Sequence, residues 1–303
     1  MSILLTGASG FIGRNLISLK NEKFRCVSRI GNFKEFDDNF IVSKIDGYTV
    51  WDGAFDDCDS VIHLAGLAHS SSFTESDLRR INVDGTIHLA NEAVKAGVKR
   101  FIYISSIGVN GSFTLEQPFS LVSDPFPHNF YTQSKLDTEL ALKKLSDETG
   151  LEIVIIRPTL VYGANAPGNF GLLTNLINKF HCLPFGLINN RRDFISVHNL
   201  ADLLITCVKH PNAGGHTFLA AENESVSTKQ FTNAIARGLG VRLFQLPIPA
   251  SLMRLVGKLI GKSSMIEQLV GNLQVDSSCL IEILDWTPPY TMKESMTFLK
   301  QEK

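Results

Sequence analysis

TGASGFIG, residues 6–13, is the stretch of sequence that decides the fold. It follows a short apolar run at residues 3–5 and opens an amphipathic segment at residues 11–20, which predicts a strand, a glycine turn and a helix. Gly7 permits the tight turn, Gly10 admits a pyrophosphate close to the backbone, and Gly13 lets the helix lie against the strand. The stretch therefore predicts a dinucleotide-binding domain, with contacts from Gly7, Ser9, Gly10, Phe11, Ile12 and Gly13.

The bulk composition argues against several classes of protein. The chain has 303 residues, with 29 Lys and Arg against 30 Asp and Glu, so its net charge of −1 offers no basic footprint for nucleic acid. Apolar residues make up 44% of the chain, but no uninterrupted run approaches the length of a membrane span, and no signal peptide is expected. The five scattered cysteines form no C-x-x-C pair, which argues against a metal site or disulfides and favours the cytoplasm.

The end of the second predicted strand, residues 24–28, bears on the choice of cofactor. A carboxylate there would bind the ribose hydroxyls of NAD, whereas an arginine can pair with the 2′-phosphate of NADP. The chain has Ser28 followed by Arg29 and no carboxylate, which favours NADP(H), with NAD(H) and an ordinary exposed arginine as the alternatives. A third strand is predicted at residues 41–45, and Asp46 after it is expected either to contact the adenine amino group or to form a simple turn.

The fourth strand is predicted at residues 59–64 and leads into small residues that allow a close approach of the cofactor, so Leu64, Ala65 and Gly66 are expected contacts. His63 inside this apolar strand is expected to be a core histidine. Residues 74–97 have helical spacing and contain Asn82, a position that is usually exposed to solvent in a helix.

The strongest catalytic pattern follows the fifth predicted strand, residues 100–104, which delivers Ser105 and Ser106 at its carboxyl end. Tyr131 and Lys135 then lie four residues apart at the start of a helix that is predicted to run to Thr149, so they share one helical face. An ammonium beside a phenol is expected to lower the phenol pKa and to create a proton donor and acceptor for an alcohol–ketone couple.

The remaining pattern predicts a doubly wound, Rossmann-type parallel α/β sheet with a smaller, mostly helical substrate lobe. Residues 1–163 are expected to form the dinucleotide-binding domain, to which residues 192–224 return. Residues 164–191 and 225–303 are expected to form the substrate lobe, because the strand–helix alternation breaks after Gly163. The apolar segment at residues 252–260 is expected to be a packed helix of that lobe rather than a membrane contact.

Taken together, the motifs resemble the extended short-chain dehydrogenase/reductases, and within them the NAD-dependent epimerase/dehydratase family that includes UDP-glucose 4-epimerase. The resemblance covers nearly the whole chain and rests on TGASGFIG (6–13), VIHLAG (61–66), NVDGT (82–86), FIYISSIGVNG (101–111), YTQSK (131–135), RPTLVYG (157–163) and RRDFISVHNLAD (191–202).

The resemblance implies a role for each matching residue. Tyr131 would be the acid/base at the sugar C4 oxygen, Ser106 would bond that oxygen, and Lys135 would tune the tyrosine and hold the nicotinamide ribose. The further cofactor contacts implied are Asn82, Ser105, Pro158 and Val161. The implied substrate contacts, besides Ser106 and Tyr131, are Asn169, Phe185 against a uracil ring, and Arg192 on the UDP phosphates. Many relatives form dimers through two helices, here at residues 74–96 and 130–149, so a homodimer is an expectation.

Departures from the family pattern refine the expected activity. Asn110 stands where a tyrosine is usual, Asn199 where an aspartate is usual, and the second strand lacks the acidic end of an epimerase that recycles NAD internally. PGNFGLL (167–173), LPFGLINNRR (183–192) and WTPPY (286–290) look closer to reductases of O-antigen synthesis that convert UDP-4-keto-6-deoxy-N-acetylglucosamine to UDP-N-acetylquinovosamine.

The preferred expectation is therefore an NADPH-dependent 4-keto reductase acting in surface-polysaccharide synthesis. A UDP-glucose or UDP-N-acetylglucosamine 4-epimerase with tightly bound NAD is the alternative. A non-catalytic NADP-binding scaffold or sensor is an alternative of another class. A 4,6-dehydratase is disfavoured, because Ile107 follows Ser106 where such enzymes carry an acidic pair.

Overall fold

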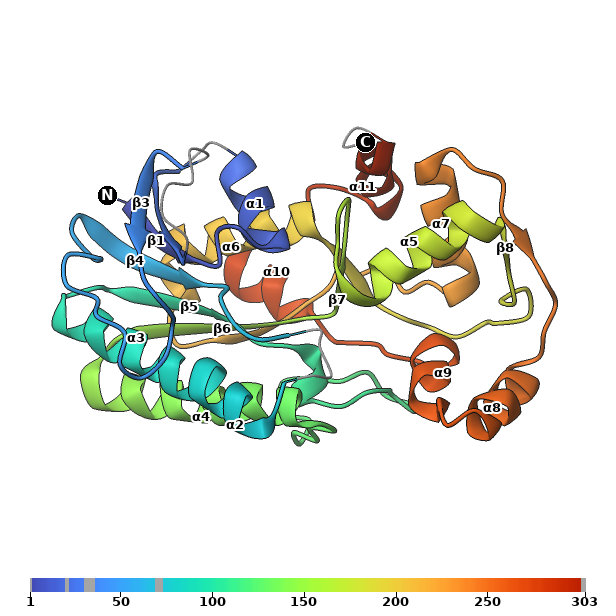
Figure 1. Ribbon diagram of the computed structural model, residues 1–303, viewed down its shortest axis with the longest axis horizontal. Helices are drawn as coiled ribbons and strands as arrows, with labels where there is room; N and C mark the ends of the chain where they lie inside the picture. The colour runs from blue at the N-terminus through green and yellow to red at the C-terminus, as the bar shows by residue number, and fades with distance from the viewer. Residues whose placement is uncertain (1, 20–21, 30–35, 69–72, 301–303) are drawn as a thin grey trace.

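The computed structural model describes residues 2–19, 22–29, 36–68 and 73–300. Its central feature is a parallel sheet of seven strands in the order β3-β2-β1-β4-β5-β6-β10 (Figure 1). The strands are β1 (Ser2–Thr6), β2 (Phe24–Ser28), β3 (Asp38–Ile41), β4 (Cys58–His63), β5 (Arg100–Ile104), β6 (Glu152–Pro158) and β10 (Thr217–Ala220). The strand order reverses between β1 and β4, so the sheet has its topological switch point beside the glycine turn.

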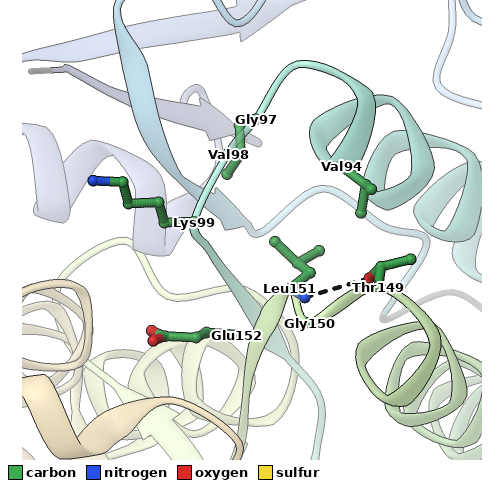
Figure 2. A pocket seen from close by; sticks show the side chains of 8 residues that line it. All are labelled: Val94, Gly97, Val98, Lys99, Thr149, Gly150, Leu151 and Glu152. Carbon is green, nitrogen blue, oxygen red and sulfur yellow. Dashed lines mark hydrogen bonds between the residues drawn. The ribbon is translucent and has the colours of Figure 1, made fainter.

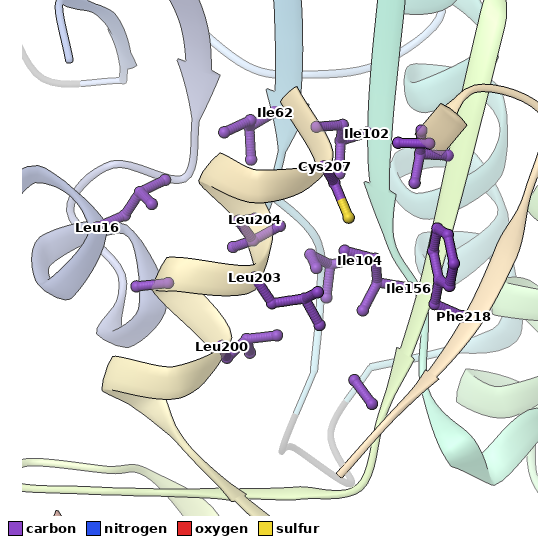
Figure 3. Packing of buried hydrophobic residues seen from close by; sticks show 14 of the residues in the cluster. Leu16, Ile62, Ile102, Ile104, Ile156, Leu200, Leu203, Leu204, Cys207 and Phe218 are labelled. Carbon is purple, nitrogen blue, oxygen red and sulfur yellow. The ribbon is translucent and has the colours of Figure 1, made fainter. Parts of the chain in front are cut away.

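Helices cover both faces of this sheet. One face packs against α1 (Phe11–Ser18), α6 (Val197–Lys209) and α10 (Ser278–Leu284). The other packs against α3 (Gly85–Lys95) and α4 (Phe130–Thr149). Figure 3 shows the first interface, where α6 turns its apolar side chains toward the central strands; those labelled are Leu200, Leu203, Leu204 and Cys207. A parallel strand between two helical layers is buried on both faces, and this is why the central strands are near-continuous apolar runs.

A second, smaller lobe lies at the carboxyl edge of the sheet (Figure 1). Its helices are α5 (Gly168–Phe180), α7 (Thr228–Leu239), α8 (Ala250–Leu259), α9 (Ser263–Val270) and α11 (Met292–Thr297). Its short strands pair as β7 (Leu160–Tyr162) with β9 (Phe194–Ser196), and β8 (Cys182–Leu183) with β11 (Phe244–Gln245). The core of this lobe contains packed aromatic rings. Phe194 stacks on Phe231 there, with ring centroids 3.8 Å apart. The described residues also form short 3₁₀ turns at Ile107–Val109, Pro211–Ala213 and Phe298–Lys300.

The predicted α/β fold with a helical second lobe is confirmed, but the division of the chain between the lobes is less simple than expected. Helix α10 lies inside the range assigned to the substrate lobe, yet Cys279, Leu280 and Leu284 pack into the core beneath the large sheet. The last part of the chain therefore crosses back to the first lobe and returns to the second with α11 (Figure 1).

Two elements differ from the prediction. The third strand is Asp38–Ile41 rather than 41–45, because Val42 and Ile45 reach the core from the turn that follows the strand. The helix predicted at residues 74–97 is divided into α2 (Glu75–Leu78), a π-helical segment (Arg79–Asp84) and α3. No helix among the described residues is long and apolar enough to cross a membrane.

Candidate active site

The glycine turn forms a cradle that side chains would fill. Gly7 has a φ of +74°, and a Cβ there would lie 2.8 Å from the backbone nitrogen of Ala65. A Cβ on Gly13 would lie 2.4 Å from the carbonyl oxygen of Gly7, so α1 can approach β1 this closely only with glycine. Gly10 is the N-cap of α1 and has no side chain to occupy the N–H groups of the first turn. These residues fit the pyrophosphate of a dinucleotide, which would bind against the cradle.

Asn82 connects the loop after β4, which lies beside this cradle, to α4. It is buried rather than exposed, and it lies in the π-helical segment. Its Oδ1 accepts a hydrogen bond of 2.7 Å from Leu67 N–H, and its Nδ2 donates to Leu67 O at 3.1 Å and to Ser134 Oγ at 3.2 Å. A Cβ on Gly66 would lie 3.1 Å from the Asn82 Oδ1. Asn82 therefore fixes the loop after β4 to α4, a role that its place in the sequence did not indicate.

Tyr131 and Lys135 lie in the first turns of α4, which begins with a capping box between Asn129 and Thr132. The buried Lys135 Nζ donates a 2.8 Å hydrogen bond to the carbonyl oxygen of Ile104, at the end of β5. The same nitrogen is 4.7 Å from the ring centroid of Tyr103 and 5.9 Å from that of Tyr131. The structure thus brings the tyrosine, the lysine and the carboxyl end of β5 together.

The pKa values of this pair are set mainly by burial. Burial lowers the pKa of Lys135 to about 8, against an opposing effect of Glu139. Burial also raises the pKa of Tyr131 to about 12. The structure shows the opposite of the expected lowering of the phenol pKa, because burial disfavours the charged phenolate. Near neutral pH the phenol keeps its proton.

The two serines after β5 have different surroundings. Ser106 is partly exposed, and its Oγ accepts a 3.1 Å hydrogen bond from Gly108 N–H. A Cβ on Gly108 would lie 3.3 Å from that oxygen, so the glycine keeps the space beside Ser106 open. Ser105 is buried, and its Oγ donates a 2.5 Å hydrogen bond to Glu139. A cofactor contact expected from Ser105 would have to come from its backbone.

Glu139 belongs to a buried ion pair that the sequence analysis missed. Arg157 on β6 donates to its two carboxylate oxygens from Nε at 2.9 and 3.2 Å, and from Nη1 to Asn110 Oδ1 at 2.9 Å. Both members of the pair are buried. The pair locks α4 to β5 and β6 directly behind Ser106, and the asparagine found where a tyrosine was expected is part of it. No local spacing in the sequence indicated this pair, because Glu139 and Arg157 lie on different elements.

The residues expected to contact the adenosine end of the cofactor lie on separate segments of the chain. Arg29 is exposed directly after β2, at the carboxyl edge of the sheet. Asp46 is buried, and its carboxylate pairs with Lys44 at 2.7 Å and accepts from Tyr48 N–H at 3.0 Å, which lowers its pKa. This arrangement matches the turn alternative and leaves the adenine contact without support. Pro158 ends β6, and Val161 lies on β7.

His63 is a core residue, as its apolar strand suggested. Its ring nitrogens bond to Thr6 Oγ1 at 2.7 Å and to Thr86 Oγ1 at 2.8 Å, and burial lowers its pKa to about 3. It therefore stays neutral and has no free nitrogen for chemistry.

Two of the three expected substrate residues converge on α9. The buried Arg192 donates a 3.0 Å hydrogen bond to Gly271 O directly after this helix, and burial lowers its pKa to about 10. Asn169 at the start of α5 donates to Gln268 Oε1 at 3.2 Å. Phe185 instead lies in the core of the second lobe with 3% of its surface exposed. The expected stacking of its side chain on a uracil ring is wrong, because no ring face is free.

The departure at Asn199 has a structural counterpart. Its Nδ2 donates a 2.5 Å hydrogen bond to the buried carboxylate of Glu222 and a 2.8 Å bond to Tyr290 O. Glu222 also accepts from Tyr162 Oη at 2.9 Å and from Ser196 N–H at 2.7 Å. A carboxylate is thus present in this region, but it belongs to Glu222 rather than to residue 199. Asn199 donates a hydrogen bond to it.

Two hollows in the described part of the chain lie away from Tyr131 and Lys135. One, of about 390 Å³, lies at the amino ends of β5 and β6 between the ends of α3 and α4; Figure 2 shows its lining, which includes Gly97, Lys99 and Glu152. The other, of about 520 Å³, lies between α1 and residues 164–167. The described residues contain no group of three or more His, Cys, Asp or Glu that could hold a metal ion.

Comparisons with known proteins show the family and the fold. The sequence profile of the NAD dependent epimerase/dehydratase family matches residues 3–221. A UDP-glucose 4-epimerase of Vibrio cholerae is 40% identical over 97% of this chain and 92% of its own length. The structure of a UDP-glucose 4-epimerase from Thermotoga maritima with UDP-glucose superposes with a TM-score of 0.78 at 19% identity, covering 99% of this chain and 97% of that one.

A third similar protein is the structure described as RMD from Pseudomonas aeruginosa complexed with NADPH. It has a TM-score of 0.76 at 20% identity, covering 99% of this chain and 98% of that one. At these identities the two structures show that the fold is shared, and the profile match shows the family. The expectation of an NAD(P)-dependent enzyme of this kind is confirmed: the chain belongs to the NAD-dependent epimerase/dehydratase family.

Proposed function

We propose that this protein is an oxidoreductase acting at C4 of a UDP-sugar. The observation that carries the proposal is the convergence of Tyr131, Lys135 and the carboxyl end of β5, with Ser106 following on the same strand end. A phenol, an ammonium and a hydroxyl in this arrangement suit proton transfer at a carbon that interconverts between alcohol and ketone. The UDP-sugar comes from the relatives, which act on such substrates or bind them.

The residues would divide the work as follows. A bound nicotinamide would supply or accept the hydride. Tyr131 would exchange a proton with the C4 oxygen, and the Ser106 hydroxyl would hydrogen-bond that oxygen as charge develops on it. Lys135 would hold the nicotinamide ribose, while the glycine cradle would hold the pyrophosphate. Arg192 and Asn169 would bind the phosphates and the sugar nucleotide from the second lobe.

The form of this chemistry that we favour is NADPH-dependent reduction of UDP-4-keto-6-deoxy-N-acetylglucosamine to UDP-N-acetylquinovosamine. One observation supports it. Strand β2 ends at Ser28 and is followed by the exposed Arg29 with no carboxylate, which suits the 2′-phosphate of NADPH. The Tyr131 phenol, whose pKa burial raises to about 12, is available as the proton donor at the C4 oxygen that a reduction requires.

A 4-epimerase of UDP-glucose or UDP-N-acetylglucosamine is the second candidate. It is favoured by the 40% identity to a UDP-glucose 4-epimerase over nearly the full length of both chains. It would use the same three residues but keep its cofactor bound, remove the C4 hydride and return it to the other face of the keto sugar.

One experiment separates these candidates. Purified protein is mixed with the 4-keto sugar nucleotide, and absorbance of NADPH or NADH is followed in parallel reactions. Stoichiometric oxidation of NADPH is the expected result. Interconversion of UDP-glucose or UDP-N-acetylglucosamine with its C4 epimer, without added cofactor and without oxidation of NADPH by the keto sugar, would instead establish the epimerase. No turnover with any of these substrates, together with retained NADPH binding, would favour a scaffold or sensor.

A further inference from the structure

Helix α8 exposes a broad apolar face to solvent. Five large apolar side chains on it or directly after it are between 46% and 78% exposed: Leu252, Leu255, Val256, Leu259 and Ile260. The helix lies at the outer edge of the second lobe, away from the large sheet (Figure 1). A contiguous apolar face of this kind is uncommon on a soluble surface unless something covers it.

The packing of α8 explains why these side chains are not in the core. The helix is held through a narrow stripe in which Met253 and Gly257 are buried. A Cβ on Gly257 would lie 2.6 Å from the side chain of Ile266, so α9 approaches α8 directly at the glycine. At about 100° per residue, Leu252, Leu255, Val256 and Leu259 share an arc of roughly 100° that points away from this stripe. The sequence expectation of a packed lobe helix thus holds for one side only.

Basic residues lie along one side of the apolar arc and directly after the helix. Arg254, Lys258 and Lys262 are exposed, and the chain has no acidic residue from 250 to 266. Arg254 is paired with Glu267 at 2.8 Å, so Lys258 and Lys262 provide the excess positive charge. By the helical spacing Lys258 borders the apolar arc, where its long side chain can place the ammonium at the edge of an apolar layer.

We propose that α8 binds the surface of an anionic lipid bilayer, with its leucines in the interface and Lys258 and Lys262 on the headgroups. An apolar arc bordered by lysines is the pattern of a helix that lies in the plane of a membrane. A second copy of the chain fits less well, because a symmetric contact through this face would bring the lysines of both copies together. The proposal concerns a surface remote from the catalytic residues and does not depend on the proposed function.

The position of α8 gives this contact a consequence for the site. Helix α9 follows α8 directly and leads to Gly271, whose carbonyl accepts the hydrogen bond from Arg192. Gln268 on α9 accepts the bond from Asn169. The helix pair that would meet the membrane therefore also borders the expected substrate residues, so binding at the bilayer would hold that side of the second lobe close to the lipid surface.

The test is sedimentation of the full chain with vesicles of phosphatidylcholine, alone or mixed with phosphatidylglycerol, at low and high salt. We expect the wild-type protein to bind the mixed vesicles at low salt and to be released at high salt. Leu255→Glu/Leu259→Glu is expected to weaken binding at least about tenfold. Lys258→Gln/Lys262→Gln is expected to weaken it severalfold and to reduce its salt dependence.

A matched control separates this face from general surface stickiness. Leu115 and Val122, outside α8, are 79% and 92% exposed, so Leu115→Glu/Val122→Glu adds the same two charges elsewhere and should bind vesicles as the wild type does. Circular dichroism and thermal unfolding verify that every variant is folded. The proposal is overturned if the wild type does not bind mixed vesicles at low salt, or if Leu255→Glu/Leu259→Glu binds as well as the wild type. Conversion of a dimer to a monomer by that variant, without vesicle binding by the wild type, would identify the face as a contact between copies.

Discussion

The two ends of strands β5 and β6 have very different surroundings. At the carboxyl edge, the side chains of Lys135, Glu139 and Arg157 are buried. Lys135 donates a hydrogen bond to the carbonyl oxygen at the end of β5, and Arg157 donates to Glu139. At the amino edge lies the hollow of about 390 Å³ in Figure 2, where Glu152 pairs with Arg100 but is itself 48% exposed. The buried charged group beside the hollow, Arg100, is held by Glu152 and by backbone carbonyls, whereas at the carboxyl edge the buried side chains of Lys135, Glu139 and Arg157 lie near the residues expected to do chemistry.

This contrast shows where function can reside in a parallel sheet. Turns at the amino edge join helices to strands, and the buried Arg100 there donates to the backbone carbonyls of Cys207, Val208 and His210. At the carboxyl edge, polar side chains must be satisfied by each other, and each is held in one position by its partners. The position of chemistry in this molecule is therefore indicated by buried polar groups rather than by the size of a cavity.

The largest expected effect is on catalysis at the carboxyl edge. Tyr131→Phe removes the proton donor, and we expect kcat to fall about 10²- to 10⁴-fold with little change in NADPH affinity. Steady-state assays and fluorescence titration of NADPH measure the two quantities. Lys99→Ala, in the amino-edge hollow, is the control and should leave kcat unchanged. Equal losses in the two variants would contradict the contrast between the edges.

A matched pair of carboxylate substitutions compares the stability of the two edges. Glu139→Gln leaves the buried Arg157 without its counter-charge, and we expect a loss of about 3–5 kcal/mol in the free energy of unfolding. Glu152→Gln removes a half-exposed carboxylate from Arg100 and should cost about 0–1 kcal/mol. Guanidinium unfolding of both variants provides the measurement. Similar losses in the two variants would show that the buried pair at the carboxyl edge stabilises the fold no more than the half-exposed pair does.

The buried lysine predicts a dependence of stability on pH. The pKa of Lys135 is lowered from 10.5 to about 8, so folding disfavours its charged form. Between these two pH values the unfolded chain binds the proton and the folded chain does not, so stability rises with pH across this window. From pH 7 to pH 10 the wild type should gain roughly 3 kcal/mol relative to Lys135→Met. Urea unfolding of both proteins at the two pH values measures this; a parallel change in both would contradict it.

The smallest expected effect concerns the cofactor at the end of β2. Arg29→Ser removes the predicted partner of the 2′-phosphate, and we expect NADPH affinity to fall about tenfold while NADH affinity is unchanged. Calorimetric titration with both cofactors measures the ratio. The exposed Arg242 in the second lobe offers a matched arginine, and Arg242→Ser should leave the ratio as it is. A wild type that already prefers NADH would remove the basis for the reductase.

Prediction from sequence succeeded where one local pattern sufficed and failed where a residue's neighbours come from elsewhere in the chain. Asn82 looked like an exposed helical residue, but it lies buried in a π-helical segment and is hydrogen-bonded to Leu67 and Ser134. Phe185 matched a substrate-contacting position by its motif, yet the second lobe buried it. The partner of Glu139 lies 18 residues away on another element, so no spacing rule indicated the pair.

The sequence by itself determined the strand–turn–helix at residues 6–13, the apolar strands of the parallel sheet and the placement of Tyr131 and Lys135 on one helical face. These features follow from local backbone freedom and from short periodicities. Tertiary structure alone decided that burial raises the pKa of Tyr131 and that Ser105 faces Glu139. It also decided that α8 presents its leucines to solvent. Burial depends on which distant segments pack together, and that information is spread over the whole chain rather than contained in any one stretch of it.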